Sequence, residues 1–162
     1  IYDGLAHGAT GSVKGVKGED LEGLDLGASF TDAPGGTATW VFTDVTGNYL
    51  DDSNTVEIEI GKATAVVTVS GYEGGIYDGD EHTQTVTVTG LGGVVLYTQG
   101  LTGKNADSYS DDWSFSDTNY EDESGVLSFA IAKARATIVV TGYAGIYDGL
   151  AHGATGLSLI HI

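Results

Sequence analysis

Apolar and polar residues alternate with a period of two along much of the chain. In residues 56–60 valine and isoleucine alternate with glutamate, and in residues 127–131 leucine, phenylalanine and isoleucine alternate with serine and alanine. Residues 85–89 alternate threonine with valine in the same way. Because successive side chains of a strand point to opposite faces, this pattern predicts β-strands with one buried face. Helical spacing is hard to find.

A pair of aromatic residues recurs at alternate positions of a predicted strand. Trp40 and Phe42 form the first pair, and Trp113 and Phe115 form the second. We expect each pair to share a face and to anchor a core. Glycine pairs and acidic or asparagine clusters separate the apolar runs, as is typical of turns. The fold class predicted is all-β, either an Ig-like antiparallel sandwich or a compact β-grasp-like module.

The chain also repeats its own sequence. Ile-Tyr-Asp-Gly begins at residues 1, 76 and 146, and a histidine follows three positions after the glycine each time. A tryptophan strand, an Asn-Tyr pair and an Ile-x-Lys-Ala segment each occur twice between these points, 71 to 73 residues apart. Insertions are therefore confined to loops. The pattern predicts a tandem array of small antiparallel β modules of about 70 residues each.

We expect the joints between modules at Lys62-Ala63 and Lys133-Ala134, directly after two of the predicted strands. On this interpretation residues 1–62 are a module that lacks its first strand, residues 63–134 are a complete module, and residues 135–156 begin a third, truncated module. The apolar residues 136–141 should then hang free or pair with a borrowed edge, for which the first module is a candidate. Modules of this size gain from packing against their neighbours.

Both ends of the sequence predict an internal fragment of a longer protein. The first residue is Ile1, and the sequence contains no methionine and no signal-peptide pattern. Residues 157–162 depart from the repeat and resemble a translated transposase sequencing adapter, as expected for a metagenomic fragment. A natural apolar strand end is the alternative interpretation of these six residues.

The repeated tyrosine segment resembles a known family. Residues 2–4, 77–79 and 147–149 each read Tyr-Asp-Gly, and each is followed by a histidine, as in the MBG/YDG-type repeat of large bacterial surface proteins and adhesins. The likeness runs over residues 1–156 and includes the approach to Trp40, the Asn-Tyr pair and the Lys-Ala joint. It implies an extracellular or cell-surface, all-β module with a structural or adhesive role, and it supplies no catalytic residues.

Charge and composition narrow the range of partners. The chain has 23 Asp and Glu against 6 Lys and Arg, a formal net charge of −17, and no cysteine. Such an acidic chain repels phosphate backbones, so nucleic-acid binding is not expected. No apolar run approaches the roughly 20 residues of a membrane-spanning helix. The expected partners are neighbouring repeats and, for an adhesive module, an extracellular glycan or protein.

Catalytic motifs are not found in the sequence. It contains no Gly-x-Ser-x-Gly elbow, no glycine-rich phosphate loop before a helix and no His-Glu-x-x-His segment. His7, His82 and His152 each stand alone at the same place in the repeat, where we expect a hydrogen bond that ties a turn. The chain is therefore predicted not to be an enzyme and to need no cofactor.

Acidic clusters are the candidates for a metal site. Calcium takes six to eight oxygen ligands, which acidic loops between β modules can supply. The spacing is not that of an EF-hand loop. The other interpretation, which we favour, is a solvated acidic stripe that keeps the array soluble. The candidate calcium ligands are Asp117, Asn119, Glu121, Glu123, Asp51 and Asp52.

Tyrosines recur near the predicted module boundaries. A sugar-stacking platform is one interpretation, but residues repeated at every boundary more often pack a joint or a core. We expect packing for these five tyrosines, which are Tyr2, Tyr72, Tyr77, Tyr143 and Tyr147.

Two functions remain in view after these exclusions. The favoured one is a non-catalytic spacer or stalk repeat of a secreted or surface-attached bacterial adhesin-like protein. The alternative is an adhesive module that binds a glycan or protein, with or without calcium. Its binding surface would be a variable loop between Gly90 and Ser110, where the two repeats differ and where Tyr97, Gln99 and Asn105 would be exposed together.

Overall fold

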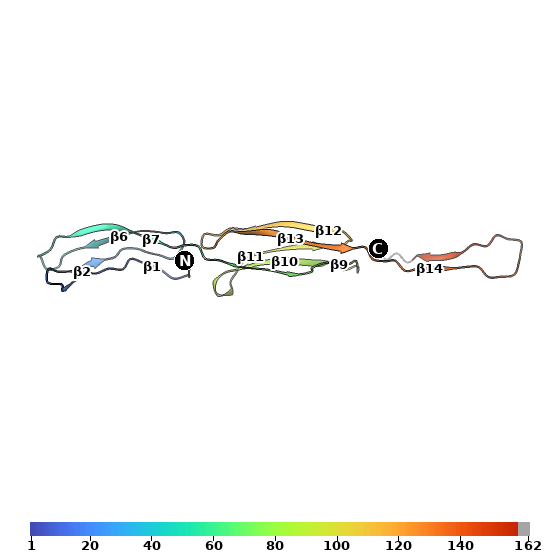
Figure 1. Cartoon of the computed structure of the whole chain (residues 1–162), viewed down its shortest axis with the longest axis horizontal. Coiled ribbons are helices and arrows are strands. Elements are labelled where there is room, and N and C mark those ends of the chain that lie inside the picture. Colours follow the sequence, from blue (N-terminus) through green and yellow to red (C-terminus); the bar gives the residue numbers. More distant parts are fainter. Residues whose placement is uncertain (159–162) are drawn as a thin grey trace.

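The computed structural model describes residues 1–158, and its regular structure consists of β-strands and one short 3-10 helix. The predicted all-β fold class is confirmed. Figure 1 shows a long, narrow molecule in which three groups of strands follow one another. We call residues 1–62 the first segment, residues 63–134 the central segment and residues 135–158 the third segment. The described residues include no helix that could cross a membrane.

The central segment contains two three-stranded sheets. The first has the order β11-β10-β8 and is antiparallel throughout. The second has the order β12-β13-β9, in which β9 runs parallel to β13. The helix η1 (Leu91–Gly93) connects β10 to β11. The bounds are β8 (Val66–Gly71), β9 (Gly75–Ile76), β10 (His82–Thr89), β11 (Val95–Gly103), β12 (Ser108–Phe115) and β13 (Glu123–Ala132).

The two sheets of the central segment enclose one hydrophobic core. Val86 and Val88 from β10 and Leu127 from β13 are fully buried, and they pack with Trp113 and Phe115 from β12. These are the apolar positions that the period of two predicted. The arrangement is a sandwich, and the described residues contain no α-helix that could cover a β-grasp sheet.

One polar side chain is buried between the sheets. Gln84, in β10, donates from Nε2 to the Tyr72 carbonyl at 3.2 Å and accepts at Oε1 from the Ser128 N–H at 2.9 Å. Both ends of the amide are therefore satisfied, as a buried polar group requires. The side chain links the β10 sheet to β13.

The first segment has a different strand pairing. Its main sheet has the order β4-β6-β7, and two further pairs, β1 with β5 and β2 with β3, are only two residues long. The bounds are β1 (His7–Gly8), β2 (Val13–Lys14), β3 (Asp20–Leu21), β4 (Leu24–Asp25), β5 (Ser29–Phe30), β6 (Gly35–Phe42) and β7 (Asp52–Glu59).

No strand of the first segment takes the place that β8 has in the central segment. There, β8 pairs with β10, Val67 packs on the core, and the preceding Ala65 is buried. Without this strand Trp40 is only half-buried and Val56 is 37% exposed. Trp40 therefore anchors a core less completely than Trp113, which has the same place in its repeat and is 7% exposed.

The third segment is a hairpin of β14 (Ile138–Thr141) and β15 (Thr155–Ser158). The prediction that residues 136–141 hang free or pair with a borrowed edge, such as one of the first segment, was wrong. β14 pairs with β15, which includes two of the residues, 157 and 158, that we had set apart from the fold. Residues 159–162 of that set lie outside the described residues. Pairing satisfies backbone groups that a free strand would leave to water.

The five repeated tyrosines differ in how far they are buried. Tyr2, Tyr72 and Tyr77 are partly buried, whereas Tyr143 is 52% and Tyr147 is 92% exposed. For these last two the packing prediction was wrong, because no second sheet covers the described part of the third segment.

The variable segment between Gly90 and Ser110 was also expected to be a loop, and this was wrong. It contains η1, the whole of β11 and the start of β12. β11 forms because Leu96, Tyr97 and Leu101 pack on the buried core. The two repeats differ here in a strand and not only in a connection.

The two tryptophans give a matched test of the missing strand. Trp113→Ala should lower the free energy of unfolding by about 3–5 kcal/mol, because it opens a cavity in a closed core. Trp40→Ala should cost less, about 1–3 kcal/mol, because Trp40 already contacts solvent. Urea unfolding followed by circular dichroism measures both. Equal losses would show that the two cores are equally closed.

Candidate functional site

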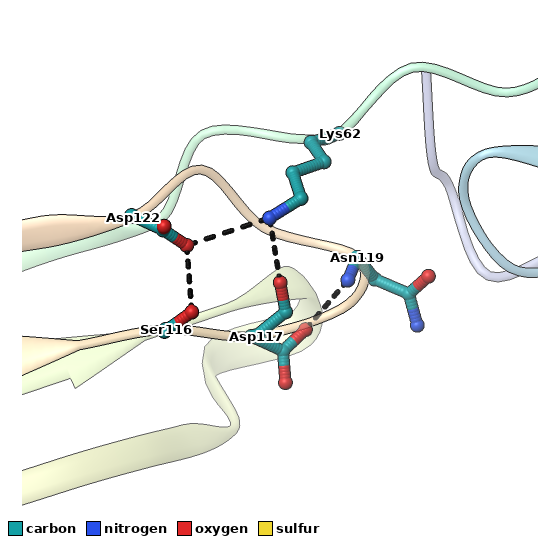
Figure 2. A network of polar contacts seen from close by, with 5 residues as sticks. All are labelled: Lys62, Ser116, Asp117, Asn119 and Asp122. Carbon is teal, nitrogen blue, oxygen red and sulfur yellow. Dashed lines mark hydrogen bonds and ion pairs between the residues drawn. The ribbon is translucent and has the colours of Figure 1, made fainter.

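Polar contacts gather where the first segment meets the central segment. Lys62 reaches the loop between β12 and β13, residues 116–122, as Figure 2 shows. Its Nζ donates to the Asp117 carbonyl at 2.8 Å and lies 3.4 Å from Oδ1 of Asp122. The lysine therefore ties the chain that leaves β7 to a loop that begins 54 residues later. We call this group of contacts, together with those of Asn119 and Tyr2 below, the joint.

Asp122 is held from two sides. Its Oδ1 accepts a hydrogen bond from Ser116 Oγ at 2.9 Å and faces the ammonium group of Lys62. The Ser116 hydrogen bond, followed by that of Lys62, lowers the pKa of Asp122 below its usual value. The carboxylate is largely exposed, so the ion pair adds little stability by itself. Its effect is to orient the loop.

Asn119 makes the contact across the segment boundary. Its Oδ1 accepts from the Ala33 N–H at 2.9 Å, and its Nδ2 donates to Oδ1 of Asp32 at 2.9 Å. Its own N–H donates to Oδ1 of Asp117 at 2.7 Å, which fixes the turn that presents it. Figure 2 shows the Asn119 side chain pointing away from Lys62. One amide thus uses both of its polar atoms on the first segment.

Backbone and aromatic contacts complete the joint. The Ala63 N–H donates to the Asn119 carbonyl at 2.8 Å, and the Glu121 N–H donates to the Ala63 carbonyl at 2.9 Å. The rings of Tyr2 and Tyr120 meet edge to face with centroids 5.6 Å apart. Tyr2 therefore packs on the core of the central segment, as predicted for this tyrosine. Directional hydrogen bonds on several sides should limit bending between the two segments.

The predicted calcium ligands are not assembled around one point. Asp117 and Asn119 take part in the joint, and the Oδ1 atoms of Asp51 and Asp52 accept backbone N–H groups at 2.8 Å. Within residues 1–158, no three His, Cys, Asp or Glu side chains form a group suited to a metal ion. Glu121 contributes its backbone N–H to the joint, and Glu123 lies at the start of β13. Calcium binding stays the alternative interpretation of these residues, and the solvated acidic stripe stays the favoured one.

The histidines tie turns, as predicted. The Nε2 atoms of His7, His82 and His152 lie 2.9, 3.0 and 2.8 Å from Oδ1 of the aspartate four residues earlier. The same oxygen accepts a backbone N–H two residues after that aspartate each time. In the turn at residues 78–82, this N–H, which belongs to Asp80, is the largest cause of the lowered pKa of Asp78. His82 also stacks on Tyr72, with centroids 3.9 Å apart.

The residues expected to expose an adhesive surface contact their own chain. The Tyr97 hydroxyl donates to Oε1 of Gln99, and Nε2 of Gln99 donates to Oδ2 of Asp111 at 2.8 Å. The backbone N–H of Asn105 donates to the Tyr109 hydroxyl at 3.0 Å. Tyr97 also packs on the core of the central segment. The structure therefore does not expose these three side chains as one set.

Comparison with protein-family models, curated proteins and solved structures found no match to this chain.

The sequence contained signals for the joint but not its geometry. Lys62 and Asn119 both belong to repeated anchors, the Lys-Ala and Asn-Tyr pairs. Lys62 contacts the loop of residues 116–122, and Asn119 lies within that loop. Only the fold brings the two residues together, because they are far apart in sequence. The sequence did not identify Asp32 and Ala33 as partners of Asn119. One of the two contacts is made by the backbone N–H of Ala33, a group that every residue except proline has.

Asp44 has the same place in the first segment as Asp117, and it offers a pH test. Its carboxylate accepts the N–H groups of Thr46, Asn48 and Tyr49. The Tyr49 N–H is the largest cause of a pKa lowered from 3.8 to about 2. A lowered pKa means that stabilisation of the loop is present above pH 3.8 and is lost as the pH falls through about 2.

Carboxyl-carbon NMR should therefore give a titration midpoint near 2 for Asp44. Asp44→Asn should remove the change in loop amide shifts over the same pH interval. A midpoint at 3.8 would contradict the hydrogen bonds observed in this loop.

Calcium can be tested on the complete chain. We expect millimolar calcium, compared with a chelator, to leave the thermal unfolding midpoint unchanged, because the oxygens of the joint already bond to the protein. A ligand that binds only the native state would raise the midpoint by mass action. A rise of several degrees that is lost in Asp117→Asn would establish a calcium site.

Proposed function

We propose that this chain is part of a non-catalytic spacer repeat in a secreted or surface-attached bacterial protein of the adhesin type. The observation that carries the proposal is the joint. It connects two β segments end to end through Lys62, Asn119 and Tyr2, and these contacts oppose bending. A spacer needs this property, because its function is to hold another part of the protein at a distance.

The repetition of the sequence supports the same proposal. The Lys-Ala pair of the joint recurs at Lys133-Ala134, where the central segment meets the third. Segments that join in a line add length in proportion to their number, so contacts between neighbours are sufficient to build a long array. Figure 1 shows the three segments following one another along the longest axis of the molecule.

The acidic surface also suits a spacer outside the cell. With a net charge of −17, neighbouring molecules repel one another, and repulsion between like charges favours extended arrangements. Charged residues such as Glu57 and Glu59 lie on the exposed face of β7, where they oppose edge-to-edge aggregation. The internal contacts of Tyr97 and Gln99 give the adhesive alternative no comparable support.

Small-angle X-ray scattering of the complete chain tests the spacer. The native chain should scatter as a straight rod, and Asn119→Ala should shorten the largest interatomic distance, because bending at the joint brings the ends closer. Asn48→Ala is the matched control, because Asn48 has the same place in the first segment but bonds only within its own loop. We expect this control to scatter like the native chain.

Two results would contradict the proposal. A native chain with the scattering of a flexible, bent molecule would show that the joint does not hold the segments in line. An Asn119→Ala chain that stays as straight as the Asn48→Ala chain would show that the amide contacts do not provide the stiffness.

A further inference from the structure

Each Tyr-Asp-Gly turn contains a chemically reactive peptide linkage. The backbone nitrogen that follows an aspartate can attack the side-chain Cγ and expel one water, which closes a five-membered succinimide ring. Glycine after the aspartate favours this reaction, because it has no side chain to shield the nitrogen. Water then reopens the ring at either carbonyl and leaves aspartate or its isomer, isoaspartate. The three linkages of this kind in the sequence are Asp3-Gly4, Asp78-Gly79 and Asp148-Gly149.

The turn of the central segment requires its glycine. Gly79 has a φ of +90°, and Gly149, in the same place of the third segment, has a φ of +79°. Residues with a side chain rarely adopt this left-handed conformation, so a substitution would strain the turn. The fold therefore keeps the reactive linkage, and protection against the reaction must come from other residues of the turn.

Two hydrogen bonds hold the carboxylate of Asp78. Its Oδ1 accepts the Asp80 N–H at 3.0 Å and lies 3.0 Å from Nε2 of His82. An ionised carboxylate has no proton to give, so His82 donates from Nε2. The Asp78 side chain is half exposed, so burial does not restrain it. The restraint on this carboxylate is the pair of hydrogen bonds.

Both hydrogen bonds favour the unreactive form of the aspartate. Ring closure expels water from the neutral carboxylic acid, because an ionised carboxylate offers no leaving group. Hydrogen bonds to the ionised form stabilise it, and those from Asp80 and then His82 lower the pKa of Asp78 below its usual value. Such bonds also lie near the plane of the carboxyl group, whereas the Gly79 nitrogen has to approach Cγ from above that plane. A rotation that presents Cγ to this nitrogen therefore works against both bonds.

Contacts that begin in the core hold the histidine in place. His82 is the first residue of β10, where its backbone pairs with Gly103 of β11. Its ring stacks on that of Tyr72, with 15° between the two planes, and its side chain is only 18% exposed. Tyr72 in turn meets the buried ring of Phe129 edge to face, with centroids 5.2 Å apart. A series of ring contacts therefore runs from the core to the donor of the Asp78 carboxylate.

The third segment repeats this arrangement. The rings of Tyr143 and His152 stack with centroids 3.8 Å apart, and Nε2 of His152 lies 2.8 Å from Oδ1 of Asp148. The same oxygen accepts the Leu150 N–H at 2.9 Å. The two residues between glycine and histidine differ between the two turns, whereas the aspartate, the glycine, the histidine and the stacked tyrosine are the same. The arrangement therefore does not depend on the variable residues of the turn.

We propose that Asp78-Gly79 and Asp148-Gly149 are sites of isoaspartate formation, and that His82 and His152 suppress the reaction by donating to the aspartate carboxylates. Isoaspartate adds one carbon atom to the main chain. Asp78-Gly79 lies between β9 and β10, where the chain passes from one sheet of the sandwich to the other, so the change would disturb the connection between the sheets. The proposal rests on the chemistry of these turns and not on the spacer function.

Peptide mapping by mass spectrometry tests the proposal on the complete chain, kept folded at neutral pH. Fragmentation of the peptides distinguishes isoaspartate from aspartate at each linkage. His82→Phe keeps an aromatic ring beside Tyr72 but removes the donor, so isoaspartate at Asp78 should form about tenfold faster, the effect of losing one hydrogen bond to a charged group. Asp148 in the same chain should keep the native rate and is the matched control. His152→Phe should give the reverse pattern.

His82→Gln separates the donor from the ring. Glutamine can place an N–H near the position of the imidazole Nε2, so this variant should react more slowly than His82→Phe although it has no ring to stack. In urea, where the turn is lost, the native chain and both variants should form isoaspartate at Asp78 at one rate. Circular dichroism checks that each variant is folded during the incubation without urea. If one is not, the His152→Phe and His152→Gln pair makes the same comparison at Asp148.

Three results would overturn the proposal. The first is a folded native chain in which Asp78 reacts as fast as it does in urea, which would show that the turn gives no protection. The second is a folded His82→Phe chain that keeps the native rate. The third is a His82→Gln chain that reacts as fast as His82→Phe or faster, which would show that a donor at this place does not protect. None of these depends on whether the joint is straight in scattering, so the two proposals fail separately.

Discussion

Closure of a hydrophobic core by one strand is the interaction on which the rest of the structure depends. In the central segment β8 pairs with β10 beside Val86 and Val88, and Ala63 and Ala65 before β8 are buried in the same core. Ala63 also belongs to the joint, so the stretch of chain that completes the core connects the two segments as well. Packing of the core and alignment of the two segments therefore depend on the same stretch of chain.

Few residues are needed to form the joint once Ala63 lies beside Tyr120. Because Ala63 pairs with the backbone on either side of Tyr120, Lys62 must lie over the loop of residues 116–122. Asn119 then faces the first segment, where Asp32 and the Ala33 N–H receive it. The stiffness proposed for the spacer comes from this fixed geometry. Exposed ion pairs such as Lys62 with Asp122 orient the chain but contribute little energy.

The same dependence explains why the segments differ although their sequences correspond. The first segment keeps the strand pair β6-β7, yet Trp40 remains half-buried and a groove stays open beside it. The third segment keeps β14 in register with β15, yet its apolar residues contact solvent.

The sequence by itself determined strands such as β10 and β13 and their buried faces. The alternation in residues 85–89 and 127–131 placed Val86, Val88 and Leu127 in the core, because a strand has only two faces and one of them is apolar. The turn bond of each histidine was equally predictable, since its aspartate lies four residues away. Tertiary structure alone decided that Lys62 contacts the loop that contains Asn119, that β11 is a strand and that β14 pairs with β15. These depend on contacts between distant residues, and local pattern contains no information about which distant surface will cover an apolar strand.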